Sequence, residues 1–462
     1  MSARSFAIAA TLAATIAASV GAQGSFIQAP PATGPRAGTP LSFRINALPA
    51  ADTLTTSYDV DGIRVIHRLT PTVNVVAANV YLLGGVRQTA DSSAGIELLL
   101  LEASERGTRA YGKDRLRRTM ARLGTTVVTE AGADWTVFGA RATTTTFDST
   151  WAVLASRLMH PTLDSAEFEL VRAQFVSGVR QRDDSPDALV SFMADSFAFA
   201  GHPYARQPVG TERSLSRITL DEVRRYHREQ MVKSRMLVVV VGNVPRARVE
   251  RLLRGTLAGL PAGSYQWTLP DTLPSSRSAL AVASRQLPTN YILGYYAGPP
   301  AGSRDYQALR IATAVLSGQL FAEIRSRRNL TYDVQAPFTE RAIASGGLYV
   351  STTSPDTTLA IMRQQIDLLA SNLVNPEGLG QLVRQFITEY FLNNETNAAQ
   401  ATFLARAQLY RGDYRAAEQF VDELHEVTPQ DIQRVVRRYI RNVRFAYVGN
   451  PSRLSARVIG AF

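Results

Sequence analysis

The pattern of apolar and polar residues divides the chain into short β-rich runs and longer segments with helical spacing. Runs rich in β-branched residues, separated by Gly and Asp turns, predict strands at residues 73–83, 125–129 and 136–143. Apolar side chains recur with the helical period at residues 149–159, 165–182 and 220–230. Because strands and helices do not alternate strictly, the order favours an α+β fold with largely antiparallel sheets over a doubly wound fold.

The pattern occurs twice. The segment LASRLMHP at 154–161 has a counterpart, LASNLVNP, at 369–376. Three more pairs follow in the same order: a Thr-rich strand end before an aspartate (143–148 and 352–356), LVRAQF with LVRQF (170–175 and 382–386), and a helix leading into a strand that ends in Gly-Asn (218–243 and 427–450). We therefore expect two copies of one domain in tandem, each a largely antiparallel sheet packed with helices.

The boundary between the copies is expected where prolines interrupt regular structure. Pro261, Pro270 and Pro274 cluster there, which predicts a linker at 261–278 between domains at 53–260 and 279–462. A chain of 462 residues suits two domains of about 200 residues each.

The first residues have the features of an export signal. Arg4 precedes an apolar run at residues 6–20, and the small residues at 20–22 offer a cleavage site, so residues 1–22 are predicted to be a signal peptide. Residues 23–52, rich in Pro, Ala and Gly, are expected to form a flexible lead-in. No other stretch has the length of a membrane span. We expect an exported, soluble protein, periplasmic or secreted, whose mature form begins near Gln23.

The amino-acid composition excludes several classes of partner and site. The net charge is +11, but Lys113 and Lys233 are the only lysines, and the arginines are scattered without a basic block or aromatic stripe. A nucleic-acid partner is therefore not expected. The absence of cysteine rules out disulfides, thiolate metal sites and a cysteine nucleophile.

Several short motifs together resemble the pitrilysin/insulinase family of zinc peptidases, which includes the mitochondrial processing peptidase. The resemblance extends over about residues 58–450. It rests on GGVR at 84–87, GIELLLLEASERGT at 95–108, HPY at 202–204 with GT at 210–211, GN at 242–243, LF at 320–321, and RSRRNLTY at 325–332.

The resemblance implies that the helix at 95–108 would carry H-x-x-E-H, with two zinc-binding histidines and a glutamate as general base. In this sequence Leu98, Leu101 and Glu102 occupy those three positions, and Gly178 occupies the place of the third zinc ligand, a glutamate. A catalytic zinc needs three protein ligands. No pair of the five histidines has ligand spacing, so we expect no metal and no cofactor in this chain, and a helix repacked into an apolar core.

The second half keeps a feature that the resemblance makes functional. Arg325 and Tyr332 match an Arg–Tyr pair that, in the family, holds the substrate and stabilises the tetrahedral intermediate. A guanidinium can bind a peptide carbonyl and a phenol can donate to an oxyanion. Asn329 replaces a family glycine and tolerates left-handed backbone. The alternative interpretation makes Arg325 an ordinary exposed helix arginine and Tyr332 a core residue at the start of a strand.

The resemblance implies one leading function. The chain would be the metal-free subunit of a heteromeric zinc peptidase, acting on peptides with a homologous, zinc-bearing subunit to which it supplies Arg325 and Tyr332 in trans. An alternative is a non-catalytic structural or peptide-binding protein that keeps the fold only. An independent enzyme is disfavoured, since no nucleophile–base arrangement is visible.

Overall fold

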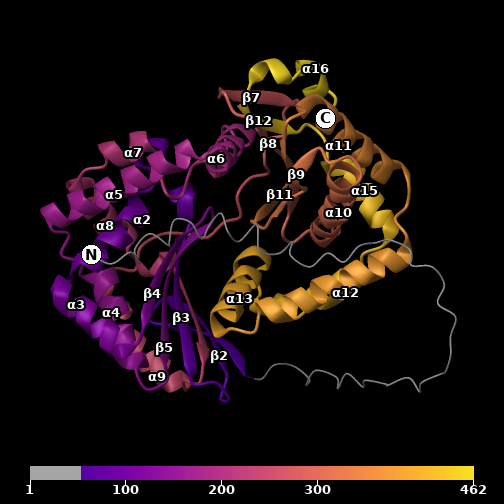
Figure 1. Cartoon of the computed structure of the whole chain (residues 1–462). Coiled ribbons are helices and arrows are strands. Elements are labelled where there is room, and N and C mark those ends of the chain that lie inside the picture. Colours follow the sequence, from indigo (N-terminus) through magenta and orange to yellow (C-terminus); the bar gives the residue numbers. More distant parts are fainter. Residues whose placement is uncertain (1–53) are drawn as a thin grey trace, which may run out of the picture. The chain divides into compact units, whose positions relative to one another are not determined.

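The computed structural model describes residues 54–462, and the predicted signal peptide and lead-in lie outside this part of the chain. Residues 54–462 form one compact unit. It contains two six-stranded sheets, one from each half of the sequence (Figure 1).

The first half builds a sheet with the strand order β1-β2-β6-β3-β5-β4. All neighbours are antiparallel except β2 and β6. The strands are β1 (Thr55–Val60), β2 (Ile63–Leu69), β3 (Val75–Leu83), β4 (Thr126–Ala131), β5 (Trp135–Thr143) and β6 (Met236–Gly242). The helices are α2 (Ile96–Ala103), α3 (Lys113–Leu123), α4 (Phe147–Met159), α5 (Ser165–Asp184), α6 (Pro186–Ala198), α7 (Glu212–Arg217), α8 (Leu220–Gln230) and α9 (Arg246–Arg254), with short 3-10 turns including η1 (Gly85–Gln88) and η4 (Pro203–Ala205).

The second half repeats this topology. Its sheet has the order β10-β11-β8-β12-β7, with β9 also paired to β11, and its parallel pair is β7 and β12. The strands are β7 (Ala279–Ser284), β8 (Asn290–Pro300), β9 (Thr331–Gln335), β10 (Phe338–Thr339), β11 (Ile343–Thr352) and β12 (Arg444–Gly449). The helices are α10 (Asp305–Leu320), α11 (Pro355–Ser371), α12 (Pro376–Asn393), α13 (Asn397–Arg411), α14 (Phe420–His425), α15 (Pro429–Tyr439) and α16 (Ala456–Ile459).

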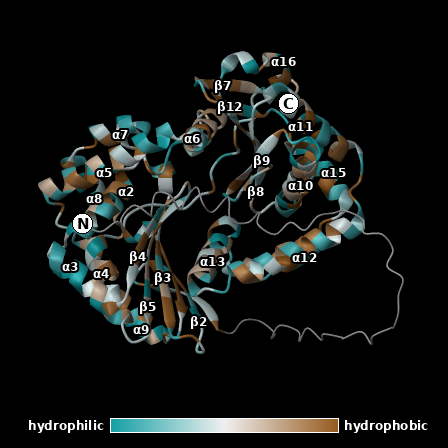
Figure 2. Ribbon diagram, viewed as in Figure 1, coloured by the Kyte–Doolittle hydropathy of each residue, from teal (hydrophilic) through white to brown (hydrophobic). Residues whose placement is uncertain are grey.

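The central strands are apolar on both faces because helices cover both sides of each sheet. In β6 every residue is buried, and Figure 2 shows brown, hydrophobic strands in the middle of the first sheet, around β3. On one face, Val238 and Val240 pack with helices of the same half. On the other face, Val239 and Val241 pack against residues of α13, which belongs to the second half. This explains a continuous apolar run in place of the period-two pattern of a half-exposed strand.

The two halves exchange equivalent helices. Helix α13 packs against β3 and β6 of the first sheet, and its counterpart α6 packs against β8 and β12 of the second. Leu189, Val190 and Ala194 of α6 form a cluster with Ala446 and Val448 of β12. Each half has its own core on one face of its sheet, and the exchange buries the other face with a helix of the other half.

Asp134, in the turn between β4 and β5, ties the halves together. Its carboxylate is 3% exposed and accepts bonds from the phenols of Tyr204 (2.7 and 2.8 Å) and Tyr410 (2.9 Å) and from the backbone N–H of Ala342 (3.1 Å). Two of these donors, Tyr410 and Ala342, come from the second half. A buried carboxylate needs such hydrogen-bond donors, because burying a charged group without partners costs free energy of folding.

The sequence-based fold prediction is confirmed. Two homologous domains follow in tandem, each with a largely antiparallel sheet packed with helices. Residues 261–278 contain no helix or strand. Within residues 54–462, no helix combines the length and apolar character that a bilayer crossing would need.

Candidate functional site

Helix α2 is a buried structural helix. Gly95 begins it in the left-handed conformation (φ 90°), where an added Cβ would lie 2.9 Å from the carbonyl oxygen of Val209. Leu98 is 9% exposed and Leu101 is 1% exposed, and α2 packs against α5, α8 and β4. The four leucines therefore fill core volume, and two of them, Leu98 and Leu101, lie where the resemblance places a zinc ligand and the general base.

A buried ion pair anchors the start of α2. Oε2 of Glu97 accepts bonds from Nη2 of Arg235 (2.9 Å) and from the phenol of Tyr226 (2.8 Å), and all three residues are buried. Nε of Arg235 also donates to the carbonyl of Leu83 (2.9 Å). Burial alone would lower the pKa of Arg235, but the Glu97 carboxylate outweighs this and the pKa lies above its usual value. Sequence reasoning missed this network, because its members are far apart in the chain and match no motif.

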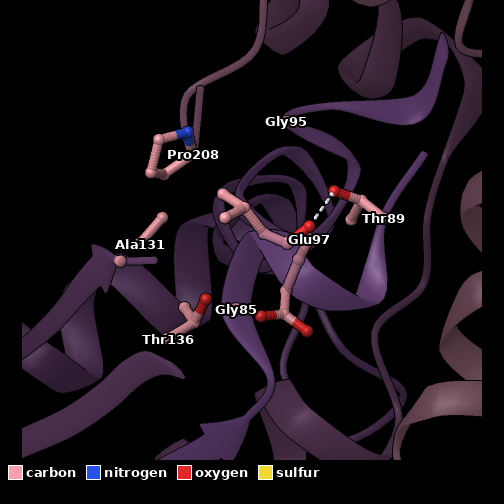
Figure 3. Close-up of a pocket in the computed structure, with 9 residues that line it drawn as sticks. Gly85, Thr89, Gly95, Glu97, Ala131, Thr136 and Pro208 are labelled. Carbon is pink, nitrogen blue, oxygen red and sulfur yellow. Dashed lines mark hydrogen bonds between the residues drawn. The ribbon is translucent and has the colours of Figure 1, made fainter. Parts of the chain in front are cut away.

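The hollow beside Glu97 is too small for a substrate. Figure 3 shows the Glu97 carboxyl group near Gly85 and Thr136, with Ala131 and Pro208 on the opposite wall. The space measures about 10 Å³, whereas small-molecule sites span about 300–1,000 Å³. Glu97 thus has a structural role.

Glu102 is the one carboxylate that remains at the vacated positions. Burial raises its pKa, the neighbouring Glu105 adds to the rise, and Arg157 opposes it. Arg157 is 2% exposed and donates to the Ser104 hydroxyl (3.1 Å) and the Leu101 carbonyl (3.1 Å). The Arg157 guanidinium therefore bonds to the last turn of α2 and partly offsets the Glu102 charge.

The residues at the vacated positions do not fit zinc. Two of them are buried leucines, and Gly178 on α5 is an exposed position where an added Cβ would meet no atom within 4 Å. Across residues 54–462, no group of three or more His, Asp or Glu side chains could hold a metal ion. This part of the chain therefore supplies no ligand set for hydrolysis at a metal centre of its own.

This geometry predicts a metal-independent fold. Purified protein is expected to contain far less than one equivalent of zinc, and its melting temperature should not change when a chelator is added, because no ion links its helices. Elemental analysis and thermal unfolding with and without chelator measure both quantities. Stoichiometric zinc that a chelator removes with a fall in Tm would contradict the assignment.

Three histidines bond to the backbone of distant segments. The ring Nε2 of His67 bonds to the Val244 carbonyl (2.7 Å), that of His202 to Asp271 (3.1 Å), and that of His227 to Leu158 (2.7 Å). Burial lowers the pKa of each ring. His160 and His425 are exposed. A neutral ring that donates one N–H to a carbonyl has a structural role.

The lowered pKa of His67 predicts acid sensitivity. Below the usual pKa of 6.5, the unfolded chain binds a proton that the folded chain excludes, so stability falls as pH drops. His67→Gln keeps an N–H donor for Val244 but cannot titrate. Between about pH 7.5 and 5.5, its Tm should fall less than that of the wild type, whereas the exposed control His425→Gln should follow the wild type. Equal slopes for all three proteins would refute this role.

Arg325 and Tyr332 lie together at an exposed place in the second half. Arg325 belongs to η7 (Phe321–Ser326), a single π-helical turn that continues α10, and Tyr332 lies in β9. The guanidinium carbon lies 4.9 Å from the centre of the Tyr332 ring and 5.0 Å from that of Phe321. Asn329, between them, has a left-handed backbone (φ 50°), as expected for the residue that replaces a glycine.

The Tyr332 phenol is available to a ligand. Its side chain is 81% exposed, so the alternative interpretation of a core residue is wrong. No hydrogen bond within residues 54–462 involves the side chain of Arg325 or of Tyr332. A π-helical turn is uncommon and often occurs at functional sites. The guanidinium can bind a carbonyl, and the phenol can donate a proton in a hydrogen bond.

Two acidic residues, Asp333 and Asp187, lie near this pair. Burial raises the pKa of Asp333, next to Tyr332, and the Asp187 carboxylate contributes to the rise while Arg325 opposes it. Asp187, in the first turn of α6, accepts a bond from the phenol of Tyr349. The Arg–Tyr pair therefore lies near a helix of the other half.

Strand β4 offers a second binding feature. Among the described strands it pairs only with β5, and it lies at the edge of the first sheet beside α2. Its outer edge presents backbone N–H and C=O groups that an extended peptide can pair with. In the repeat, β9 with Tyr332 takes the equivalent place next to β11.

Comparison with known proteins places these features in a family. Residues 64–212 match the family model described as Insulinase (Peptidase family M16), and residues 217–386 match the one described as Peptidase M16 inactive domain. An uncharacterized zinc protease of Streptomyces coelicolor is 21% identical over 390 residues, which cover 81% of this chain and 85% of that protein. A Helicobacter pylori protein described as a non-peptidase homolog is 22% identical over 255 residues, 53% of this chain and 58% of that one.

The structure is also similar to solved structures described as members of this family. A crystal structure from Pseudomonas fluorescens, described as a peptidase M16 inactive domain, superposes with a TM-score of 0.78 at 18% identity, covering 86% of this chain and 98% of that one. With Leu98 and Leu101 at the motif positions, the chain belongs to the insulinase family, peptidase family M16, as a member that lacks the zinc-binding motif.

Proposed function

We propose that this chain is the metal-free subunit of a heteromeric M16 peptidase and contributes Arg325 and Tyr332 to peptide hydrolysis in a zinc-bearing, homologous subunit. The observation that carries the proposal is the Arg325 guanidinium stacked on a phenol that is 81% exposed. The phenol hydroxyl has no hydrogen-bond partner within residues 54–462, so it can donate to a group on a ligand. The first half, in contrast, has lost its ligands.

In this proposal the chain's residues bind and orient the peptide. The outer edge of β4 pairs with an extended peptide backbone. Arg325 donates to a peptide carbonyl, and the Tyr332 phenol donates to the oxyanion that develops during hydrolysis. The zinc of the partner subunit would supply the activated water.

Purification from the native host tests the proposal. A tagged full-length chain should co-purify with a homologous chain that carries H-x-x-E-H, and the complex should cleave peptides while the isolated chain does not. Peptide cleavage by the isolated chain, or a complex without any zinc-bearing homologue, would refute the proposal.

A second candidate is a non-catalytic structural or peptide-binding protein. It is favoured by the H. pylori relative described as a non-peptidase homolog. Its signature would be stable association with other proteins and no peptidase activity in any purified complex.

The proposal includes export from the cytoplasm, because residues 1–22 have the features of a signal peptide. Protein from the native host should begin near Gln23. N-terminal sequencing that finds Met1 would contradict export.

A further inference from the structure

A polar hollow lies between the first half and the linker. It measures about 310 Å³, which reaches the size range of small-molecule sites. Its walls come from η1, from the His202–Pro203 turn and from residues 265–271 of the linker. It is separate from α2 and from the Arg325–Tyr332 pair.

The linker crosses this region as an anchored strap. The indole N–H of Trp267 donates to the Leu409 carbonyl (2.8 Å), and its ring lies 6.4 Å from that of Trp135. Farther along, His202 bonds to the Asp271 carbonyl (3.1 Å). The strap is thus anchored at two points, Trp267 and Asp271, within the segment that lines the hollow.

Arg87 provides the charge in the wall. Its side chain is 12% exposed, and Nη2 donates to the Thr268 carbonyl (2.6 Å). Nη1 is buried on the side of the Asp134 carboxylate, so a ligand in the hollow does not reach it. The nearest carboxylate oxygen, on Asp134, lies 3.5 Å away, and Asp134 already accepts bonds from Tyr204, Tyr410 and Ala342. Nε, in contrast, has no hydrogen-bond partner within residues 54–462 and is not among the buried side-chain atoms, so this N–H can bond to an additional acceptor.

The other groups in the wall also offer donors. The amides of Gln88 and Gln266 and the phenol of Tyr265 line the hollow, and no hydrogen bond within residues 54–462 involves these side-chain groups. His202 is not available, because both of its ring nitrogens are engaged with the backbone. Asp271, an exposed residue at the rim, is the one acidic residue in the lining. Donors around a guanidinium favour an acceptor-rich anion.

We propose that this hollow binds a carboxylate through Arg87, either the C-terminal carboxylate of a peptide or a small free carboxylic acid. The guanidinium pairs with the carboxylate, and the two amides and the phenol bind its remaining lone pairs or the adjacent peptide group. The site does not depend on the proposed peptidase function, because it uses none of the same residues.

Calorimetric titration of the full-length chain tests the site. The probes are trialanine, trialanine amide, which has the same shape without the carboxylate, and acetate. Trialanine should bind at least tenfold more tightly than its amide, because the ionic hydrogen bonds are lost in the amide. Acetate binding as tight as that of trialanine would identify a free acid as the ligand source, and weaker acetate binding would identify a peptide terminus. Equal binding of trialanine and its amide, or no binding of trialanine or acetate, would overturn the proposal.

Variants locate the binding in this hollow. Arg87→Ala should weaken trialanine at least tenfold, but it also removes the bond to Thr268. Gln88→Glu keeps Arg87 and places a competing carboxylate in the hollow, so it should weaken binding similarly while Tm stays unchanged. The matched control, Gln181→Glu on the exposed side of α5, should bind like the wild type. Asp271→Asn should strengthen binding about two- to threefold by removing a rim charge. Wild-type affinity in both Arg87→Ala and Gln88→Glu would exclude the site.

Discussion

Glu97→Ala is expected to lower the free energy of unfolding by about 3–5 kcal/mol, the usual cost of removing one partner of a buried ion pair. The substitution leaves the Arg235 guanidinium, 1% exposed, without its carboxylate, and leaves the Tyr226 phenol without its acceptor. Urea unfolding followed by circular dichroism measures the change. The exposed control Glu229→Ala, on the same helix as Tyr226, should change stability by no more than about 0.5 kcal/mol.

The double variant Glu97→Leu with Arg235→Met distinguishes the effect of leaving one buried charge unpaired from the effect of removing the whole ion pair. Replacing a whole buried ion pair with apolar side chains is often neutral, so the double variant should regain a large part of the lost stability. If Glu97→Ala costs no more than the Glu229→Ala control, the pair does not hold α2 in place, and the structural interpretation of this helix loses its main support.

The local elements were predictable because their patterns are strong and close in sequence. The expected strands at 73–83, 125–129 and 136–143 correspond to β3, β4 and β5, and the expected helix at 220–230 matches α8. The start of α8 was predicted accurately because a capping box fixes it. The Thr219 hydroxyl accepts a hydrogen bond from the Glu222 N–H, and the Glu222 carboxylate accepts one from the Thr219 N–H. The repeat in the sequence was sufficient to predict the repeated sheet topology.

Long-range features could not be predicted from local patterns. Helices α6 and α13 each pack on the sheet of the other half. Neither helix carries a pattern in its own sequence that identifies the sheet on which it packs. The same applies to Asp134, whose donors come from positions as far apart as Tyr204 and Tyr410. Of the candidate site, the loss of a zinc ligand at Leu98 and of the general base at Leu101 was visible in the sequence, but the exposure of Tyr332 and the Glu97–Arg235 pair were not.

The replaced metal site illustrates how a fold survives loss of its chemistry. Leu98 and Leu101 fill one ligand position and the base position of α2, the Glu97–Arg235 pair anchors the start of the helix, and Arg157 lies near its end. The Glu97–Arg235 and Arg157 contacts are all made within the chain. The Arg325–Tyr332 pair differs, because its exposed groups have no such internal use.

Tyr332→Phe is expected to reduce kcat of the assembled peptidase by about 10²–10³-fold, the usual cost of losing one oxyanion donor. It should not change folding or assembly, because the phenol is exposed and the ring that stacks under Arg325 remains. Arg325→Ala should raise KM as well as lower kcat, since a bond to a ground-state carbonyl contributes to substrate binding.

A second stacked pair offers matched controls. Arg115 lies over the Tyr111 ring in the first half, with 5.4 Å from the guanidinium carbon to the ring centre. Tyr111→Phe removes a phenol hydroxyl and Arg115→Ala removes a guanidinium, as the test variants do, but away from the Arg325–Tyr332 pair. Both control variants should therefore leave peptide cleavage unchanged.

The most direct test of the account is peptide cleavage by this chain reconstituted with its zinc-bearing partner, with assembly confirmed for each variant. The account predicts that the wild type and the Tyr111→Phe and Arg115→Ala controls cleave at one common rate, while Tyr332→Phe is slower by about 10²–10³-fold. Wild-type rates for both Tyr332→Phe and Arg325→Ala in an assembled complex would contradict it.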